Sequence, residues 1–247
     1  MSASPLRILV VDDDVDTCQN LSDILTDFGH RVDVAHDGIT ALAMVRVQPY
    51  DLALLDFKMP GMDGLTLYRE IRTLRADTVA MIVTAYATPE TRQEALEAGT
   101  WQVLSKPVDL SGLLELVEEA ARLPLVMVVD DDRELCANLW ELLRERGYRV
   151  TLAHDEPKAS ERLDEQDFQV VLVDLKLPGG DGRQVLDRVR QSNPQARTVL
   201  ITGHRSELEQ HVRQAVTEGA DAICYKPFDV PNLLETIDRL SHPQENG

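Results

Sequence analysis

Short apolar runs alternate with longer segments of helical periodicity along the whole chain. In the first half, the strand-like runs are residues 8–11, 32–35, 52–55, 79–83 and 103–104. Because these runs are apolar on both faces, they predict strands of a parallel sheet that is covered by helices on each side. From Leu110 to Val117, apolar residues recur at helical spacing behind Asp109, which is placed to cap that helix. The pattern predicts five βα units in an α/β fold with a doubly wound parallel sheet.

The second half of the chain repeats the first. A shift of 118 residues places Asp130 over Asp12 and Asp174 over Asp56. Farther along, the shift becomes 120, which predicts a two-residue insertion before the fourth helix of the second copy. Two long copies indicate a duplicated domain rather than a solenoid of short repeats. A length of 247 residues also suits two domains of average size, predicted at residues 1–123 and 124–247.

Composition and charge exclude several classes of function. The formal net charge of −18 argues against direct nucleic-acid binding, because affinity for a phosphate backbone comes largely from Lys and Arg. No apolar run reaches the roughly 18 residues of a membrane span, and the N-terminus lacks the basic start and apolar stretch of a secretion signal. Three scattered cysteines fit neither a disulfide framework nor a zinc site. We therefore expect a cytoplasmic protein with reduced cysteines and no membrane insertion.

Polar residues of distinctive chemistry stand at the carboxyl ends of the predicted strands. Asp12 and Asp13 follow the first strand, Asp56 ends the third, Thr84 ends the fourth and Lys106 follows the fifth. The equivalent residues of the second half are Asp130, Asp131, Asp174, Thr202 and Lys226. Because loops from several strands converge at this edge of a doubly wound sheet, each set is expected to lie together.

The residue types in each set point to phosphoryl chemistry. Three carboxylates at one sheet edge repel one another by several kcal/mol per close pair, so a cation must offset them. Mg²⁺ is the natural candidate, since it prefers oxygen ligands and commonly bridges a phosphoryl group to protein carboxylates. A carboxylate such as Asp56 can attack phosphorus to give an acyl phosphate. The ammonium of Lys106 and the hydroxyl of Thr84 would then hold the remaining phosphoryl oxygens.

Each of these residues, taken alone, also has a structural interpretation. A single Asp at a strand-to-helix turn usually caps the helix, and we assign that role to Asp14 and Asp132. His36 and His154 also repeat, but they lack neighbouring metal ligands and are expected to be structural surface residues. Recurrence of the complete acid, hydroxyl and lysine set in both halves favours function for the set as a whole.

Both halves resemble the receiver domains of two-component response regulators, over residues 6–123 and 125–240. The resemblance is carried by VVDDD at residues 10–14 and 128–132, LLDFKMPGMDG at 54–64, LVDLKLPGGDG at 172–182, SKP at 105–107 and YKPF at 225–228. It implies two tandem flavodoxin-like (βα)5 domains. It also implies a signalling module that transfers phosphate to itself and is not otherwise an enzyme.

The resemblance assigns a role to each residue of the two sets. Asp56 and Asp174 would accept phosphate from the phosphohistidine of a histidine kinase or a histidine phosphotransfer protein, and would pass the signal to a downstream protein. Mg²⁺ would be bound at these aspartates by Asp12, Asp13, Asp130 and Asp131 and by the backbone carbonyls of Lys58 and Lys176. Thr84 and Thr202 would be the switch hydroxyls, and Lys106 and Lys226 would contact the phosphoryl group. Pro107 and Pro227 match a family proline that usually follows a cis peptide bond.

One position departs from the family pattern, and two other functions stay open. The switch aromatic expected three residues before the lysine is Val103 in the first half and Ile223 in the second. This leaves the usual coupling of threonine motion to aromatic burial in doubt. One alternative function is the receiver pair of a larger hybrid histidine kinase. Another is a Mg²⁺-dependent phosphohydrolase that forms an aspartyl phosphate, with Asp12-x-Asp14 as its nucleophile motif.

Overall fold

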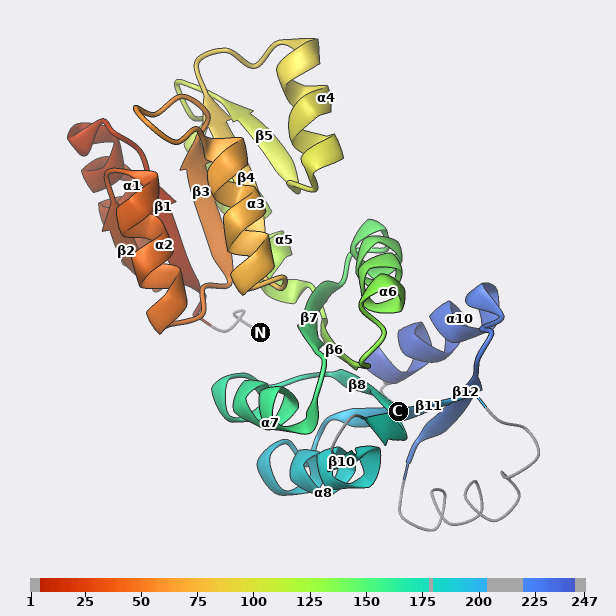
Figure 1. Cartoon of the computed structure of the whole chain (residues 1–247). Coiled ribbons are helices and arrows are strands. Elements are labelled where there is room, and N and C mark those ends of the chain that lie inside the picture. Colours follow the sequence, from red (N-terminus) through yellow and green to blue (C-terminus); the bar gives the residue numbers. More distant parts are fainter. Residues whose placement is uncertain (1–4, 178–179, 204–219, 243–247) are drawn as a thin grey trace, which may run out of the picture. The chain divides into compact units, whose positions relative to one another are not determined.

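The computed structural model describes residues 5–177, 180–203 and 220–242, and it divides into two compact units (Figure 1). The first unit is Met1–Leu123 and the second is Pro124–Gly247. The insertion predicted before the fourth helix of the second copy lies outside the described residues. Among the described helices, none has the length and apolar character that a membrane crossing requires.

The first unit alternates strands and helices from end to end. Its elements are β1 (Arg7–Val11), α1 (Val15–Asp27), β2 (Arg31–Ala35), α2 (Gly38–Val47), β3 (Leu52–Asp56), α3 (Gly64–Leu74), β4 (Val79–Thr84), α4 (Pro89–Ala98), β5 (Gln102–Ser105) and α5 (Leu110–Arg122). The five strands pair in the order β2-β1-β3-β4-β5, and every pair is parallel. The predicted doubly wound parallel sheet is thereby confirmed.

Helices cover both faces of the first sheet, because side chains alternate between the faces along each strand. Leu9 and Val11 of β1 belong to a core formed with α2, α3 and α4. Ile8 and Val10 belong to a second core, formed with α1 and α5 on the opposite face. This double burial accounts for strands that are apolar throughout.

Aspartates occupy the N-cap position, just before the first helical residue, of most helices of the first unit. The carboxylate of Asp14 accepts hydrogen bonds from the amides of Asp16 and Thr17, and Asp132 caps its own helix in the same way. Asp109 accepts from the amide of Gly112 at 3.2 Å. The helix caps predicted for Asp14, Asp132 and Asp109 are confirmed.

The second unit has the same parallel architecture. Its described elements are β6 (Leu125–Val129), α6 (Arg133–Glu145), β7 (Arg149–Ala153), α7 (Glu156–Glu165), β8 (Val170–Asp174), β9 (Lys176–Leu177), β10 (Gly180–Asp181), α8 (Gly182–Ser192), β11 (Arg197–Thr202), β12 (Ala222–Tyr225) and α10 (Val230–Ser241). The five parallel strands run in the order β12-β11-β8-β6-β7. The sequence did not predict β9 and β10, which pair antiparallel with each other just after β8.

Candidate functional site

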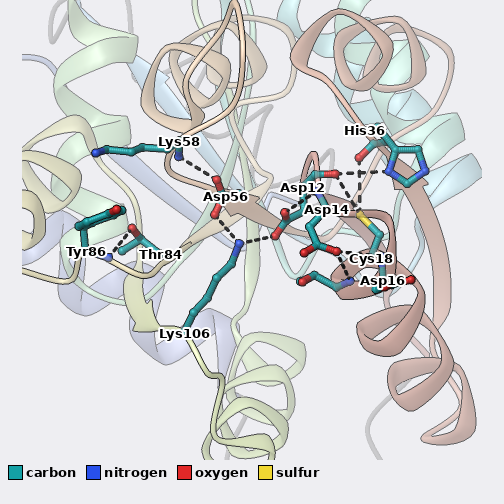
Figure 2. A network of polar contacts seen from close by, with 12 residues as sticks. Asp12, Asp14, Asp16, Cys18, His36, Asp56, Lys58, Thr84, Tyr86 and Lys106 are labelled. Carbon is teal, nitrogen blue, oxygen red and sulfur yellow. Dashed lines mark hydrogen bonds and ion pairs between the residues drawn. The ribbon is translucent and has the colours of Figure 1, made fainter.

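In the first unit, one lysine ammonium lies between two buried carboxylates at the carboxyl ends of the strands. Asp12 follows β1, Asp56 is the last residue of β3, and Lys106 follows β5. The Nζ atom of Lys106 lies 2.6 Å from Oδ2 of Asp12 and 2.6 Å from Oδ1 of Asp56. Figure 2 shows the lysine side chain reaching between the two carboxylates. Lys106 is therefore in direct contact with two residues that precede it by 94 and 50 positions in the sequence.

The second unit repeats this arrangement. The Nζ atom of Lys226 lies 2.6 Å from Oδ2 of Asp130 and 2.6 Å from Oδ2 of Asp174. Asp130 is completely buried and Asp174 is 8% exposed, close to the 3% and 6% of Asp12 and Asp56. The same contact geometry thus occurs in both units of the chain.

Backbone amides fix the second oxygen of each buried carboxylate. The amide of Asp14 donates to Oδ1 of Asp12 at 3.0 Å, and the amide of Lys58 donates to Oδ2 of Asp56 at 2.8 Å. The corresponding bonds of the second unit run from Asp132 to Asp130 at 3.0 Å and from Lys176 to Asp174 at 2.8 Å. Each buried carboxylate therefore has its orientation set by one amide and one ammonium.

A third carboxylate completes a group that suits a hard cation. Oxygens of Asp12, Asp13 and Asp56 lie within 4.8 Å of one another, as do those of Asp130, Asp131 and Asp174. Asp13 and Asp131 are exposed, whereas the other four are buried. Three carboxylates near one ammonium leave an excess of negative charge, and oxygen donors alone are the ligands that Mg²⁺ prefers. The donor set therefore fits a divalent cation in both units.

Burial and ion pairing act in opposite directions on these groups. Burial raises the pKa of Asp56 above its ordinary value, although the hydrogen bond and charge of Lys106 oppose the shift. Burial likewise raises the pKa of Asp130 against the influence of Lys226. For Lys106, burial would lower the pKa, but its hydrogen bonds to Asp12 and Asp56 raise it overall, so the ammonium is retained. The negative charge gathered here is thus costly without a further cation.

The two threonines end the fourth strand of their units, next to the strand that carries the central aspartate. Thr84 is buried, and its hydroxyl accepts a hydrogen bond from the amide of Tyr86 at 3.0 Å. Its carbonyl accepts from the amide of Lys106 at 2.8 Å, and Thr202 binds the amide of Lys226 in the same way at 2.8 Å. The structure therefore joins each threonine to the lysine through the backbone. The hydroxyl contact described for Thr84 is with Tyr86 (Figure 2).

Two glycines have a role that the sequence did not reveal. Gly64 begins α3 directly against the backbone of Asp56, where an added Cβ would lie 2.3 Å from the Asp56 carbonyl oxygen. At Gly182, the corresponding distance to the Asp174 carbonyl oxygen is 2.2 Å. Both distances are far shorter than a van der Waals contact, so only glycine fits. The Asp-Gly pairs of the two motifs were visible in the sequence, but the close approach of the backbones was not.

Other contacts around Asp12 and Asp56 also emerge only in three dimensions. Lys58 places its ammonium 4.0 Å from the centre of the Tyr86 ring. Cys18 is buried, and burial together with the charge of Asp12 raises the pKa of its thiol to about 11, so the thiol keeps its hydrogen. The peptide bonds before Pro107 and Pro227 are cis, which confirms the expectation for these prolines.

The position of the expected switch aromatic is aliphatic in both units, buried in the first and partly buried in the second. Val103 is 5% exposed in the core beside α4, and Ile223 packs against the corresponding core of the second unit. Asp14, which the phosphohydrolase alternative would use beside its nucleophile, is engaged as the cap of α1. The geometry thus favours Asp56 over the Asp12-x-Asp14 pair as the centre of the site.

Comparisons with known proteins identify the family of this chain. The family model described as the response regulator receiver domain matches residues 8–118 and 126–238. A response regulator receiver protein of Anaeromyxobacter sp. (strain Fw109-5) is 36% identical over 235 residues, which cover 95% of this chain and 94% of that protein. The transcriptional regulatory protein ZraR of Klebsiella oxytoca is 40% identical over 120 residues, which cover 49% of this chain but only 27% of that protein.

Among solved structures, a CheY-like receiver domain protein from Methanospirillum hungatei JF-1 is 35% identical. The matched region covers 48% of the present chain and 94% of the Methanospirillum chain, with a TM-score of 0.46. The family match extends over both halves and most of the chain. The chain therefore belongs to the response regulator receiver family of two-component signalling proteins and carries two receiver domains in tandem.

Proposed function

We propose that Asp56 and Asp174 are two phosphoacceptor residues, each served by its own acidic group and lysine. The observation that carries the proposal is the lysine ammonium that contacts two buried carboxylates at 2.6 Å in both units. A structural ion pair needs one carboxylate, whereas two carboxylates on one lysine, with a third acid alongside, form a preorganised polar site. We infer that the two receiver domains correspond to residues 1–123 and 124–247.

In the proposed reaction, a carboxylate oxygen of Asp56 attacks the phosphorus of a phosphohistidine. A P–O bond forms as the P–N bond breaks, and the imidazole nitrogen leaves with the electron pair of the broken bond. The donor is a histidine kinase or a histidine phosphotransfer protein. Asp174 reacts in the same way in the second domain. The donor's histidine is thereby regenerated, and the signal is held as an acyl phosphate.

The chain's own residues position the phosphoryl group and balance its charge. Asp12, Asp13, Asp56 and the carbonyl of Lys58 would hold Mg²⁺, which would neutralise negative charge on the phosphoryl oxygens. The amide of Lys58 orients the Asp56 carboxylate, and Lys106 moves from that carboxylate to a phosphoryl oxygen. The hydroxyl of Thr84, which accepts from the Tyr86 amide, would donate its own hydrogen to another phosphoryl oxygen. In the second domain, the corresponding residues are Asp130, Asp131, Asp174, Lys176, Thr202 and Lys226.

The output of the phosphorylated chain is proposed to be contact with a downstream signalling protein. The strongly negative net charge of −18 supports this output, because it disfavours direct nucleic-acid binding. The proposal therefore describes a self-phosphorylating module, and not an enzyme that turns over a substrate.

Intact mass after incubation with acetyl phosphate and Mg²⁺ tests the proposal. The unmodified sequence should gain two phosphoryl groups, whereas Asp56→Asn and Asp174→Asn should each gain one. Asp14→Asn is the matched control, because Asp14 is also an aspartate near the site but caps α1. If either single variant of Asp56 or Asp174 still gains two groups, the assignment of the acceptors is wrong.

A further inference from the structure

The carbonyl of Asp12 has two side-chain partners that the proposed reaction does not use. Strand β1 ends at Val11, and the Asp12 amide makes one more strand-like bond, to the Ala35 carbonyl at 3.2 Å. The Asp12 carbonyl instead accepts from the thiol of Cys18 at 3.3 Å and lies 3.3 Å from Nδ1 of His36. Figure 2 shows both side chains directed at this oxygen. Side chains thus hold the backbone just where it leaves the sheet.

The second domain contains the same arrangement. The Asp130 amide donates to the Ala153 carbonyl at 3.1 Å. The Asp130 carbonyl accepts from the thiol of Cys136 at 3.3 Å and lies 3.0 Å from Nδ1 of His154. The cysteine and histidine therefore recur together, with the same bonds to the same backbone atom of the corresponding aspartate.

The chemistry of the carbonyl fixes the direction of the histidine bond. A carbonyl oxygen can only accept, so Nδ1 of His36 must carry a hydrogen and donate it. His36 itself is exposed and contributes little to the core. The other polar atoms of Asp12 also have partners, because its amide donates to Ala35, Oδ1 accepts from the Asp14 amide and Oδ2 accepts from Lys106.

We infer that His36 and Cys18 are positioning residues for the cation site of the first domain, and that His154 and Cys136 serve the second. They hold the backbone of Asp12 or Asp130, which fixes the direction of a carboxylate that binds the cation. Groups that orient a metal ligand through hydrogen bonds affect metal affinity without touching the metal. The inference rests on the proposed function, since it takes these carboxylates to be Mg²⁺ ligands.

Magnesium titration of the unphosphorylated full-length chain, followed by amide chemical shifts, tests this inference. Amides near Asp56 report on the first site and those near Asp174 on the second, so each variant contains its own reference site. His36→Ala should weaken Mg²⁺ binding at the first site by about 2- to 10-fold, the range expected for one hydrogen bond. Binding at the second site should not change. His154→Ala should show the reverse pattern.

Two further variants separate positioning from a general loss of structure. His36→Asn keeps a side-chain N–H donor at a similar distance from the backbone and should restore most of the affinity. His30→Ala is the matched control, because the ring of His30 also bonds to a backbone group, the amide of Leu6 at 3.2 Å. It should leave Mg²⁺ binding unchanged. The ¹⁵N resonances of the His36 ring should show hydrogen on Nδ1.

Each alternative result has a definite meaning. Unchanged affinity in His36→Ala, equal loss in His36→Ala and His36→Asn, or equal loss in His30→Ala would overturn the positioning role. Any of these results can occur while Asp56 and Asp174 still accept phosphate, in which case only this inference fails. Absence of Mg²⁺ binding to the unmodified chain would instead overturn the proposed metal site and the inference together.

Discussion

Replacing Gly64 by alanine should displace the phosphoacceptor strand end and destabilise the first domain. The new Cβ would lie 2.3 Å from the carbonyl oxygen of Asp56 and 3.1 Å from its carbonyl carbon. Both neighbours are backbone atoms, so relief requires α3 or the end of β3 to move. The backbone conformation of Gly64 itself does not demand glycine, because its φ is not among the positive values of this chain. Steric overlap is therefore the cause of the expected effect.

The magnitude follows from the cost of inserting a methyl group into a closely packed region. Overpacking of this kind lowers the free energy of unfolding by about 1–3 kcal/mol, and replacing a helical glycine by alanine raises it by at most about 1 kcal/mol. We expect a net loss of roughly 1–2 kcal/mol, which lowers the unfolding midpoint of a domain of this size by about 3–10 °C. Phosphorylation of Asp56 by acetyl phosphate should slow as well, because the carboxylate shifts with its backbone.

Calorimetric unfolding of the full chain, in parallel with the phosphorylation rate, measures both effects. Gly112→Ala is the matched control, since its Cβ would meet only the end of the Asp109 side chain, at 3.0 Å, and that side chain can move. Gly182→Ala should reproduce the Gly64→Ala result in the second domain, where the added Cβ would lie 2.2 Å from the carbonyl oxygen of Asp174. A Gly64→Ala protein as stable and as readily phosphorylated as the unmodified chain would refute the argument.

Two other predictions concern the charges of the site. Mg²⁺ at ten times its dissociation constant should stabilise each domain against thermal unfolding by about 1.4 kcal/mol. Asp13→Ala should remove most of this stabilisation from the first domain only. If the stabilisation of the first domain is unaffected by that change, the assigned ligands are wrong. Burial raises the folded-state pKa of Asp56, so in Mg²⁺-free buffer the contribution of Asp56 to stability should be largest below the ordinary carboxyl pKa and should be lost as pH rises through the raised value. Asp56→Asn should therefore stabilise the Mg²⁺-free domain near neutral pH by about 1–3 kcal/mol, because it removes a buried charge whose desolvation Lys106 offsets only in part. An unchanged or lower unfolding temperature would exclude this explanation.

The sequence predicted the fold and the meeting of the site residues for a physical reason. Strands that are buried on both faces leave a strong apolar signal, and parallel strands bring their carboxyl ends to one edge. Asp12, Asp56 and Lys106 could therefore be placed together from their positions after β1, β3 and β5. The same acids, hydroxyl and lysine recur at the corresponding positions of the second half, which indicates a shared function rather than a chance arrangement.

Other features could not be predicted, because they depend on how one backbone approaches another. Gly64 looks like any glycine before a helix until the position of the Asp56 carbonyl is known. The sequence predicts a structural surface residue at His36. The side chain is exposed, but its ring also bonds to the Asp12 carbonyl. The short β9–β10 pairing has only two residues per strand, too few to leave a periodic pattern.

The central claim is that Asp56 and Asp174 both carry the phosphoryl group. Borohydride reduces an acyl phosphate and leaves homoserine in place of the aspartate, so peptide mapping after treatment of the phosphorylated chain locates each acceptor directly. The account predicts homoserine at positions 56 and 174 and at no other aspartate, including the neighbouring Asp12 and Asp130. Homoserine at another position, or its absence from either of these two, would contradict it.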